Sequence, residues 1–366
     1  MPPNFDPAVN SVTLRVLLLT RYPRMGASSR VRFLQYISGL RQFGIEVEPA
    51  PFWSESHLHS VYDRNVHRIE ELITGWLRRV GWLCRLGRYD LVWVEKEILP
   101  WLPQRPALWA FRNVPLVVDF DDAWHLRYAR MPAASWFFRE NLEGLARRAS
   151  IVTTANPVLE RWAQDAGALD VVRLPSAVDT NRYKVAPRPA DAPFTIGWIG
   201  TPLTADYLAD IAGALGRILA QQNTRLLVVG IPRFSVGRIS AEAHPWSEAT
   251  EVELLQKIDV GIMPLRDGAW ERAKSAYKLL QYFAVGRPGV ASPVGMSKEM
   301  ITPGVTGFWA SSEDEWVTVI NTLRSNPEFA GTMGAAGRRL VETSYSVETR
   351  LPQVAALLKR AAARPS

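Results

Sequence analysis

TLRVLLLTRYPRMGASSRVRFLQYISGLRQFG, residues 13–44, joins an apolar run of strand length, a loop of small residues and an amphipathic segment. The run at 13–20 is apolar almost throughout, as in a strand that is buried on both faces. From 31 to 43 the apolar residues recur at helical spacing, and Gly44 supplies a stop signal. The stretch is therefore predicted to be a βα unit of a parallel sheet.

The same alternation continues along the chain. Further strands are predicted at 45–52, 89–97, 114–122, 150–157, 170–179, 194–200, 225–230 and 259–265. A Pro/Ala-rich stretch without periodicity, KVAPRPADAPF at 184–194, separates two halves that each contain such strands. The predicted fold class is α/β, with two doubly wound Rossmann-like domains that face a cleft at the carboxyl ends of their strands.

These patterns also predict the domain boundaries. We expect an N-terminal domain over 1–185, a linker over 186–193 and a C-terminal domain over 194–345. The C-terminal domain is expected to contain one helix from Ala205 to about Gln222. The last segment, 346–366, is expected to be a helix, and a return to the N-terminal domain is one arrangement open to it.

The composition indicates a globular protein with anionic partners. The chain has 366 residues, 47% of them hydrophobic, and a net charge of +7 with a pI near 9.6. This balance favours nucleotide phosphates, anionic lipid or nucleic acid. No helix-turn-helix, zinc or RNA-binding motif accompanies it, so nucleic acid is not expected. Cys84 is the only cysteine and the five histidines lack an HExxH spacing, which argues against disulfides and a zinc enzyme.

The sequence shows no segment that would direct it out of the cytoplasm. The first residues carry no basic and apolar leader, and no uninterrupted apolar run reaches ~18 residues. We therefore expect a cytoplasmic protein that does not span a membrane.

Two motifs of the N-terminal half follow predicted strands. In GASSR at 26–30, small residues, a helix start and Arg30 could hold an anion, but a plain connection capped by Ser28 or Ser29 is an equal alternative. In DFDDAWH at 119–125, carboxylates could hold a divalent metal with a diphosphate or bind sugar hydroxyls without metal. A solvated helix cap is the simpler interpretation of that second motif.

The stretch AKSAYKLLQYFAVGRPGVASPVG at 273–295 carries cations at the start of an apolar helix. Lys274 and Lys278 lie four residues apart, on one helix face if the helix has begun by Lys274, and like charges so placed are unfavourable unless an anion lies between them. A diphosphate would relieve that repulsion, and Gln281 could reach ribose hydroxyls. The alternative is a solvated helix face.

The chain resembles the retaining glycosyltransferases of family four, which have the GT-B fold. The resemblance rests on IGWIGTPLTADYL, on the stretch DVGIMPLRDGAWERAKSAYKLLQYFAVGRPGVASPVG, on GVTGFWA and MGAAGRRLVETSYS, and on GASSRVRFLQYISGLRQFGIEV and DFDDA. It implies that the C-terminal domain binds a UDP- or GDP-sugar donor and that the N-terminal domain admits a hydroxyl acceptor. It implies neither a cofactor nor a metal.

The resemblance also assigns residues, with departures. The two glutamates of the family fall on Ala273 and Gln281, and its Gly-Phe-Gly loop falls on Lys274, Ser275 and Ala276. Lys274, Lys278 and Arg30 are expected to balance the diphosphate charge, and Asp121 is expected to orient the donor sugar or the acceptor hydroxyl. The remaining assignments are donor contacts at Ser28, Ser29, Gly200, Thr201, Gly230, Ser275, Ala276 and Gln281, and acceptor-side contacts at Glu97, Asp122 and His125.

Two other functions remain open on the sequence. A noncatalytic protein that only binds nucleotide sugars is suggested by Ala273, and a nucleotide-sugar epimerase shares the fold. The acceptor could be a glycan, a lipid-linked precursor or a secondary metabolite.

Residues 71–88, ELITGWLRRVGWLCRLGR, bear on the acceptor. Their apolar stripe, Trp76, Leu77, Val80, Leu83 and Cys84, with arginines largely elsewhere, is typical of a helix that packs on a sheet, or of one that lies on an anionic membrane. The packed helix is the favoured interpretation.

Overall fold

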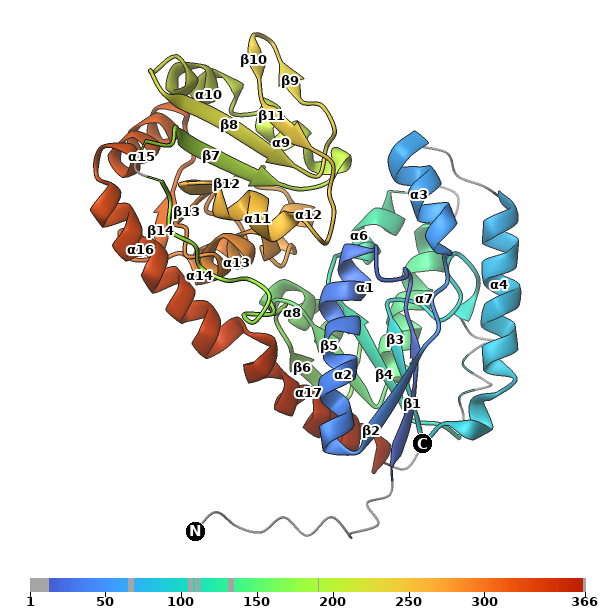
Figure 1. Ribbon diagram of the computed structural model, residues 1–366. Coiled ribbons are helices and arrows are strands. Elements are labelled where there is room, and N and C mark those ends of the chain that lie inside the picture. The colour runs from blue at the N-terminus through green and yellow to red at the C-terminus, as the bar shows by residue number, and fades with distance from the viewer. Residues whose placement is uncertain are drawn as a thin grey trace, which may run out of the picture.

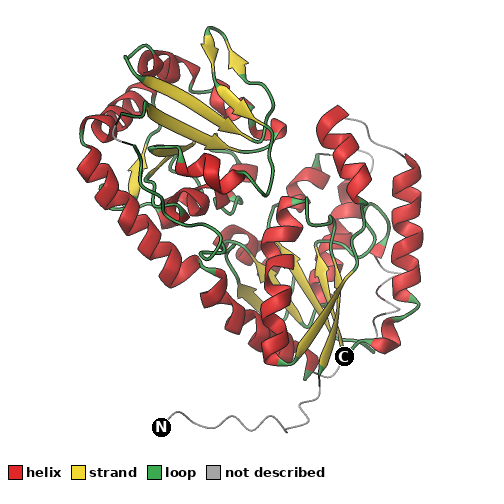
Figure 2. Ribbon diagram, in the orientation of Figure 1, coloured by secondary structure: helices red, strands yellow, loops and turns green. Residues whose placement is uncertain are grey.

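Two six-stranded parallel sheets, each covered by helices, form the two halves of the protein (Figures 1 and 2). This computed structural model describes residues 13–64, 69–104, 108, 111, 113–130, 135–189 and 191–364. The predicted α/β class is confirmed.

The N-terminal sheet has the order β2-β1-β3-β4-β5-β6 and every pairing in it is parallel. Its central strands are apolar and completely buried, because helices cover both faces. The strands are β1 (Leu14–Leu19), β2 (Ile45–Pro49), β3 (Leu91–Glu95), β4 (Leu116–Phe120), β5 (Ile151–Thr154) and β6 (Val171–Arg173). The helices of this half are α1 (Ala27–Arg32), α2 (Ile37–Leu40), α3 (Glu55–Arg64), α4 (Ile69–Leu83), α6 (Trp124–Ala129), α7 (Ser135–Arg148) and α8 (Pro157–Asp165).

The C-terminal sheet has the order β11-β8-β7-β12-β13-β14 and is also parallel. Its strands are β7 (Phe194–Ile199), β8 (Thr224–Val229), β11 (Glu242–His244), β12 (Val260–Met263), β13 (Gly289–Ala291) and β14 (Gly307–Trp309). The helices are α9 (Asp206–Ala209), α10 (Ala212–Leu219), α11 (Glu251–Gln256), α12 (Ala269–Arg272), α13 (Tyr277–Ala284), α14 (Ser297–Met300), α15 (Glu313–Ser325) and α16 (Pro327–Leu340). A short antiparallel hairpin, β9 (Ser235–Val236) and β10 (Ile239–Ser240), follows β8.

The single helix expected from Ala205 to Gln222 is wrong in its continuity. The chain forms α9 and then α10, with the backbone of Ile211 outside the helical region between them. Both helices still bury apolar residues against the sheet, so the apolar spacing survives the interruption.

The last helix, α17 (Val347–Ala362), packs on the N-terminal sheet (Figure 1). Its apolar face, which includes Leu351, Val354 and Leu358, joins the core beside β1, β3 and β4. The chain thus crosses between the halves twice, near Val178 and near Ser346, and these residues pair as a parallel bridge. The carboxyl ends of the two sheets lie next to each other, since Arg24 after β1 pairs with Glu248 after β11 and Asn156 after β5 binds the Ala273 carbonyl.

Candidate functional site

Charged side chains cluster where β1, β3 and β4 end. β3 is followed by a tight turn in which the Glu97 N–H donates to the Glu95 carbonyl at 2.7 Å across Lys96, whose φ is +63°. A turn of this type is rare and strained for a residue other than glycine. Glu95, Lys96 and Glu97 are nevertheless all buried, with 1–2% of their surface exposed.

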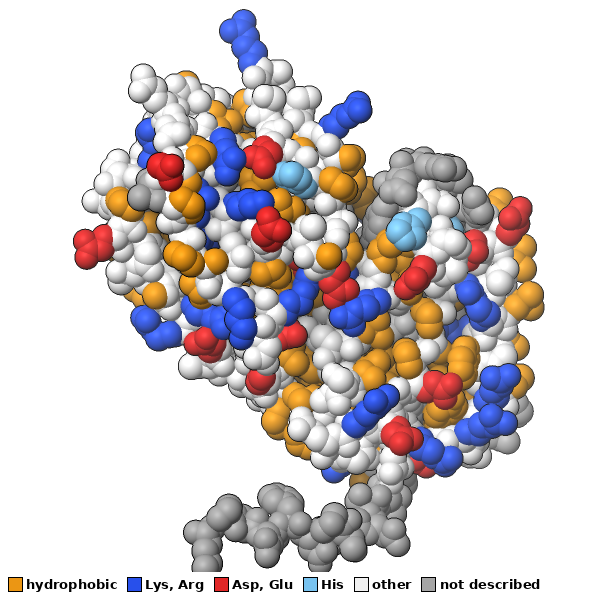
Figure 3. All heavy atoms as spheres, in the orientation of Figure 1, with side chains coloured by type: hydrophobic (Ala, Val, Ile, Leu, Met, Phe, Trp, Pro, Cys, Tyr) orange, Lys and Arg blue, Asp and Glu red, His pale blue; other side chains and the backbone are white. Residues whose placement is uncertain are grey.

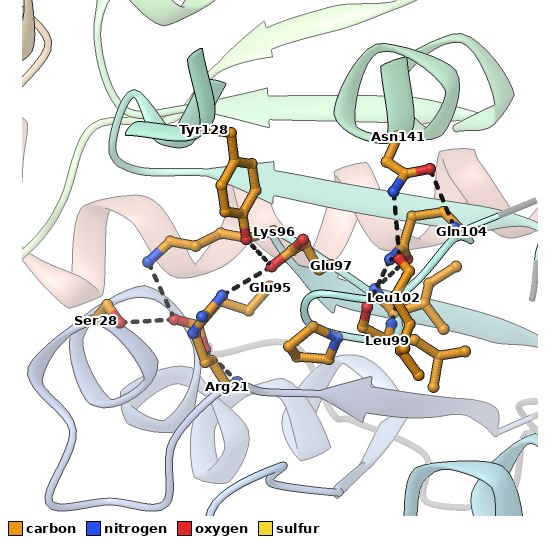
Figure 4. A network of polar contacts seen from close by, with 12 residues as sticks. Arg21, Ser28, Glu95, Lys96, Glu97, Leu99, Leu102, Gln104, Tyr128 and Asn141 are labelled. Atoms are coloured by element: carbon orange, nitrogen blue, oxygen red, sulfur yellow. Dashed lines mark hydrogen bonds and ion pairs between the residues drawn. The ribbon is translucent and has the colours of Figure 1, made fainter. Parts of the chain in front are cut away.

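Glu95 binds the first turn of α1 and the loop that precedes it (Figure 4). The hydroxyls of Ser28 and Ser29 donate to its two carboxylate oxygens at 2.6 and 2.5 Å, and the Arg21 N–H donates to it at 2.8 Å. The two serines therefore do not cap α1, whose N-cap is Gly26 without a side-chain hydrogen bond. In this state their hydroxyl protons are directed toward Glu95.

Glu97 accepts hydrogen bonds from Arg21 Nη1 at 2.9 Å and from Tyr128 Oη at 2.8 Å (Figure 4). The Arg21 guanidinium lies between the rings of Trp101 and Trp124, 4.3 and 4.2 Å from their centroids. The Glu97 carboxylate is thus the anion of a buried ion pair with Arg21, and it is not exposed for contact with an acceptor.

Asp121 and Asp122 follow β4 and have opposite electrostatic environments. Lys96 Nζ lies 2.9 Å from Asp121 Oδ1. Burial alone would raise the pKa of Asp121, but the ammonium of Lys96 holds that pKa below its usual value. Asp122 is half-buried, and burial together with the charge of Asp121 raises its pKa, while Lys274 from the other half opposes the rise.

The two lysines of the 273–295 stretch lie close together, but not on one helix. Helix α13 begins at Tyr277, so Lys278 is in its first turn and Lys274 is in the loop before it; the proposed shared helix face is wrong. Lys278 Nζ lies 3.9 Å from the centroid of the Trp198 ring, and Lys274 Nζ lies 5.4 Å from that of Trp270. Within the described residues neither lysine has a carboxylate at ion-pair distance. Burial lowers the pKa of Lys278 well below its usual value, and Lys274 adds to the shift.

Backbone conformation explains why helix α13 starts where it does. Ala276, its N-cap, has φ +51° and ψ +33°, in the left-handed region where glycine is favoured. Ser275 lies in the same turn and is half-buried.

Gly200 and Gly230 line the same end of the sheet. A Cβ on Gly200 would lie 2.7 Å from Lys278 Nζ, and a Cβ on Gly230 would lie 1.7 Å from the Gly200 carbonyl oxygen. Thr201 next to them is exposed, and its N–H donates to Thr204 Oγ1. Both glycines are required for the close approach of β7, β8 and α13.

Gln281 is buried and binds within the protein. Its Nε2 donates to Tyr183 Oη at 2.9 Å, and Tyr183 in turn donates to Glu251 at 2.8 Å. Glu251 also accepts from Trp246 Nε1 at 2.5 Å, and the Arg30 guanidinium lies 4.2 Å from the Trp246 ring centroid. Gln281 and Arg30 therefore belong to one network that joins the two halves.

Ala273, on which the resemblance places a glutamate, is completely buried at the boundary between the halves. It packs with Ala123, Ala155 and Leu159 of the N-terminal half, and its carbonyl accepts a hydrogen bond from Asn156 Nδ2 at 2.6 Å. The position is thus filled by apolar packing in this state.

The remaining predicted residue, His125, stacks on Trp162 with the ring centroids 4.6 Å apart. Within the described ranges no three His, Cys, Asp or Glu side chains lie close enough together to hold a metal ion.

Sequence reasoning missed Lys96, Arg21 and the Tyr183–Glu251 pair. For Lys96 a signal was available, because VEKE follows an apolar strand at the carboxyl end where parallel sheets bind ligands. For Tyr183 and Glu251 no local signal exists, since their partners lie far away in the sequence.

Both the sequence and the fold of this chain are similar to those of known proteins. Residues 193–326 match the family of glycosyl transferases group 1. No curated protein sequence matches the chain.

Solved structures match nearly the whole chain. Anabaena Alr3699/HepE in complex with UDP-glucose has a TM-score of 0.69 at 16% identity, over 94% of this chain and 99% of that one. Sucrose-phosphate synthase (tll1590) from Thermosynechococcus elongatus has a TM-score of 0.68 at 15% identity, over 95% and 98% of the two chains. A glycosyltransferase from Rickettsia africae ESF-5 has a TM-score of 0.67 at 12% identity, over 96% and 99%. The chain therefore has the GT-B fold.

Proposed function

We propose that the protein is a retaining glycosyltransferase that moves a sugar from a nucleotide-diphosphate donor to a hydroxyl acceptor without a metal ion. The group 1 match and the GT-B neighbours, one of them bound to UDP-glucose, support nucleotide-sugar glycosyl transfer. The observation that carries the proposal is that Lys274 and Lys278, at the start of α13, have no carboxylate at ion-pair distance among the described residues. A diphosphate would supply the negative charge that this pair lacks.

In this proposal the C-terminal half stabilises the leaving group. Lys274, Lys278 and the free N–H groups at the start of α13 would bind the diphosphate and the charge that develops on it during transfer. The absence of a Cβ at Gly200 allows Lys278 Nζ to approach the end of β7, so that this ammonium lies beside the strand end where the nucleotide would bind. Asp121, across the boundary, would orient the donor sugar or the attacking hydroxyl.

Nucleotide binding tests the proposal. Lys274→Ala and Lys278→Ala should each weaken binding of UDP or GDP by about 1–3 kcal/mol, as measured by isothermal titration calorimetry. Because the pKa of Lys278 is low in the free protein, binding should take up protons and weaken as pH rises. Lys298→Ala, an exposed lysine on α14 of the same half, is the matched control. Unchanged affinity in both variants would remove the phosphate site.

A noncatalytic sugar-nucleotide binder is the second candidate, and the buried Ala273 favours it. The two are separated by turnover. A working transferase releases nucleoside diphosphate from its donor only with an acceptor, and Asp121→Ala should lower that release far more than it lowers donor binding. Tight donor binding without turnover over a broad panel of donors and acceptors would support the second candidate.

We further propose that the acceptor is reached at an anionic membrane surface, through α4. The favoured expectation that its stripe packs on the sheet is wrong for part of it: Leu77, Val80 and Cys84 are exposed, whereas Trp76 and Leu83 are half-buried. Ile69 and Ile73 extend the exposed face at helical spacing. In Figure 3 hydrophobic and basic side chains alternate along the edge where α4 lies.

The basic side chains beside this face, Arg85 and Arg88, are exposed. Apolar residues with flanking arginines are suited to the interface of an anionic bilayer. The structure has no described helix with the length and hydrophobicity to cross a bilayer.

Liposome cosedimentation tests this contact. Vesicles that contain anionic lipid should retain the protein at low salt and release it as salt rises. Leu77→Glu should abolish retention, whereas Leu169→Glu, at a leucine that is 86% exposed elsewhere, should not. If Leu77→Glu instead converts a dimer to a monomer without any effect on vesicles, the face binds a second copy of the chain.

A further inference from the structure

Three consecutive charged residues, Glu95, Lys96 and Glu97, are buried at the end of β3. Charged side chains are rarely buried unless they are paired. Glu95 has three hydrogen-bond donors and Glu97 has two, all from elsewhere in the N-terminal half. Lys96 is different, because its partners are carboxylates and it reaches the end of a neighbouring strand.

The backbone at Lys96 is strained, and its side chain points to Asp121. Its φ of +63° is a conformation that glycine adopts freely and lysine does not. Glycine here would relieve the backbone but would remove the ammonium. The chain therefore has a strained lysine at a position where glycine would be unstrained but would provide no buried cation.

The Lys96 ammonium faces a defined set of groups. Asp121 Oδ1 lies at 2.9 Å and Glu95 Oε1 at 3.6 Å, and the Trp124 ring centroid lies at 5.4 Å. Asp122 and Tyr22 also raise the pKa of Lys96. Arg32 lowers the pKa of Asp121, and Asp119 in turn raises the pKa of Arg32. Because the serine hydroxyls and the Arg21 N–H already bind Glu95, the closest charge that Lys96 balances is Asp121.

Asp121 lies next to the boundary with the other half. Two residues later, Ala123 packs against Ala273, which precedes Lys274. The charge of Lys274 opposes the rise in the pKa of Asp122. We propose that Lys96 is a positioning residue that keeps the Asp121 carboxylate ionised and oriented toward the donor loop. This inference rests on the proposed transferase function, in which Asp121 orients the reacting groups.

Stability alone does not account for the pair. A buried ion pair is often no more stabilising than apolar residues of similar volume, and here it is combined with a strained turn. The arrangement does give Asp121 a fixed negative charge in a buried place where its pKa would otherwise rise.

Carboxyl titration tests this without any need for turnover. The protein is labelled with ¹³C at the aspartate carboxyl carbon, and the Asp121 resonance is identified by its loss in Asp121→Asn. In the wild type it should titrate below the usual value of about 3.9. In Lys96→Met it should titrate about 1–3 pH units higher than in the wild type. A wild-type Asp121 that titrates at or above the usual value, or an unchanged titration in Lys96→Met, would overturn the proposal.

Two further variants guard against a folding defect. Lys96→Gly removes the same charge while it relieves the positive φ, so it should fold and show the same titration shift as Lys96→Met. Lys96→Arg keeps the charge and should restore a low titration point. Lys257→Met, at an exposed lysine that pairs with Glu253, controls for the loss of one positive charge.

Enzyme kinetics supply the second measurement. In Lys96→Met the rate at neutral pH should fall roughly 100-fold with donor affinity unchanged, and the acidic limb of kcat/KM should move to higher pH. A uniform fall with the limb unmoved would indicate a structural role and overturn the proposal. Absence of turnover in the wild type would overturn the proposed function alone, since the carboxyl titration still decides the Lys96–Asp121 coupling.

Discussion

At the scale of single residues, the role of Gln281 follows from the direction of its hydrogen bond. Tyr183 has one hydroxyl proton, which it donates to Glu251 at 2.8 Å, so its oxygen accepts the Gln281 amide at 2.9 Å. Glutamate has an oxygen of similar reach but lacks this donor. The equivalence of Gln281 with the glutamate of the family therefore fails inside the protein, whatever the side chain contacts in a complex.

We predict that Gln281→Glu destabilises the protein at neutral pH by about 1–3 kcal/mol, because it replaces a donor by a second carboxylate near Glu251. Burial and Glu251 would raise the folded-state pKa of the new carboxyl. The destabilisation should therefore be absent below the unfolded-state pKa, about 4.3, and should grow as pH rises toward the folded-state value. Urea unfolding at several pH values measures it.

The matched control is Gln353→Glu. Gln353 is exposed on α17 and accepts a hydrogen bond from Arg350 through its oxygen, which glutamate also offers. That exchange should leave stability nearly unchanged. Equal stability of Gln281→Glu and wild type at pH 7 would show that the Tyr183 contact contributes little.

Residue roles at the site were only partly predictable. The placement of Asp121 and Asp122 after a strand, and of Lys278 at a helix start, follows from local pattern. Lys96 also follows a strand, but its burial was not predictable, because charged residues after a strand are usually solvated. Its surroundings, Asp121 and Trp124, are brought together only in the folded sheet.

At the scale of elements, apolar periodicity predicted the six strands of the N-terminal sheet and β7, β8 and β12 of the C-terminal sheet, but not the three-residue strands β11, β13 and β14. It failed where elements are very short, as in the two-residue strands β9 and β10. It also favoured a packed stripe on α4 that is partly exposed, because an apolar stripe has the same spacing whether it faces a sheet or the outside.

Helix α13 offers an element-scale test, because its first turn begins at a left-handed alanine. We predict that Ala276→Gly stabilises the protein by about 1 kcal/mol by relief of the positive φ. Thermal or urea unfolding measures this. Gly304→Ala should have the opposite effect of similar size, since Gly304 has φ +77° and a Cβ there would meet no other atom. A destabilising Ala276→Gly would mean that the Ala276 methyl group contributes more through packing than its conformation costs.

At the scale of the whole molecule, the two halves are joined at their carboxyl ends by a few contacts. Arg24 forms a bidentate ion pair with Glu248, with distances of 3.0 and 2.7 Å, Arg30 stacks on Trp246, and Asn156 binds the Ala273 carbonyl. The ion pair is largely exposed and contributes at most about 1 kcal/mol. An exposed ion pair therefore holds the boundary closed only weakly, while the chain itself links the halves near Val178 and Ser346, which pair as a bridge.

Ala273 provides the test of this arrangement. Glutamate there would meet Ala123, Ala155 and Leu159 and would bury an unpaired carboxylate, which costs several kcal/mol. Because the boundary contacts are weak, separation of the halves is the less costly response. We predict that Ala273→Glu remains folded but has a larger radius of gyration in small-angle X-ray scattering, and that lower pH reverses the change by protonation of the new carboxyl. Ala269→Glu, an exposed alanine at the start of α12 in the same loop region, should leave the radius unchanged. An unchanged radius in Ala273→Glu with wild-type stability would mean that the boundary already accommodates a side chain of that size.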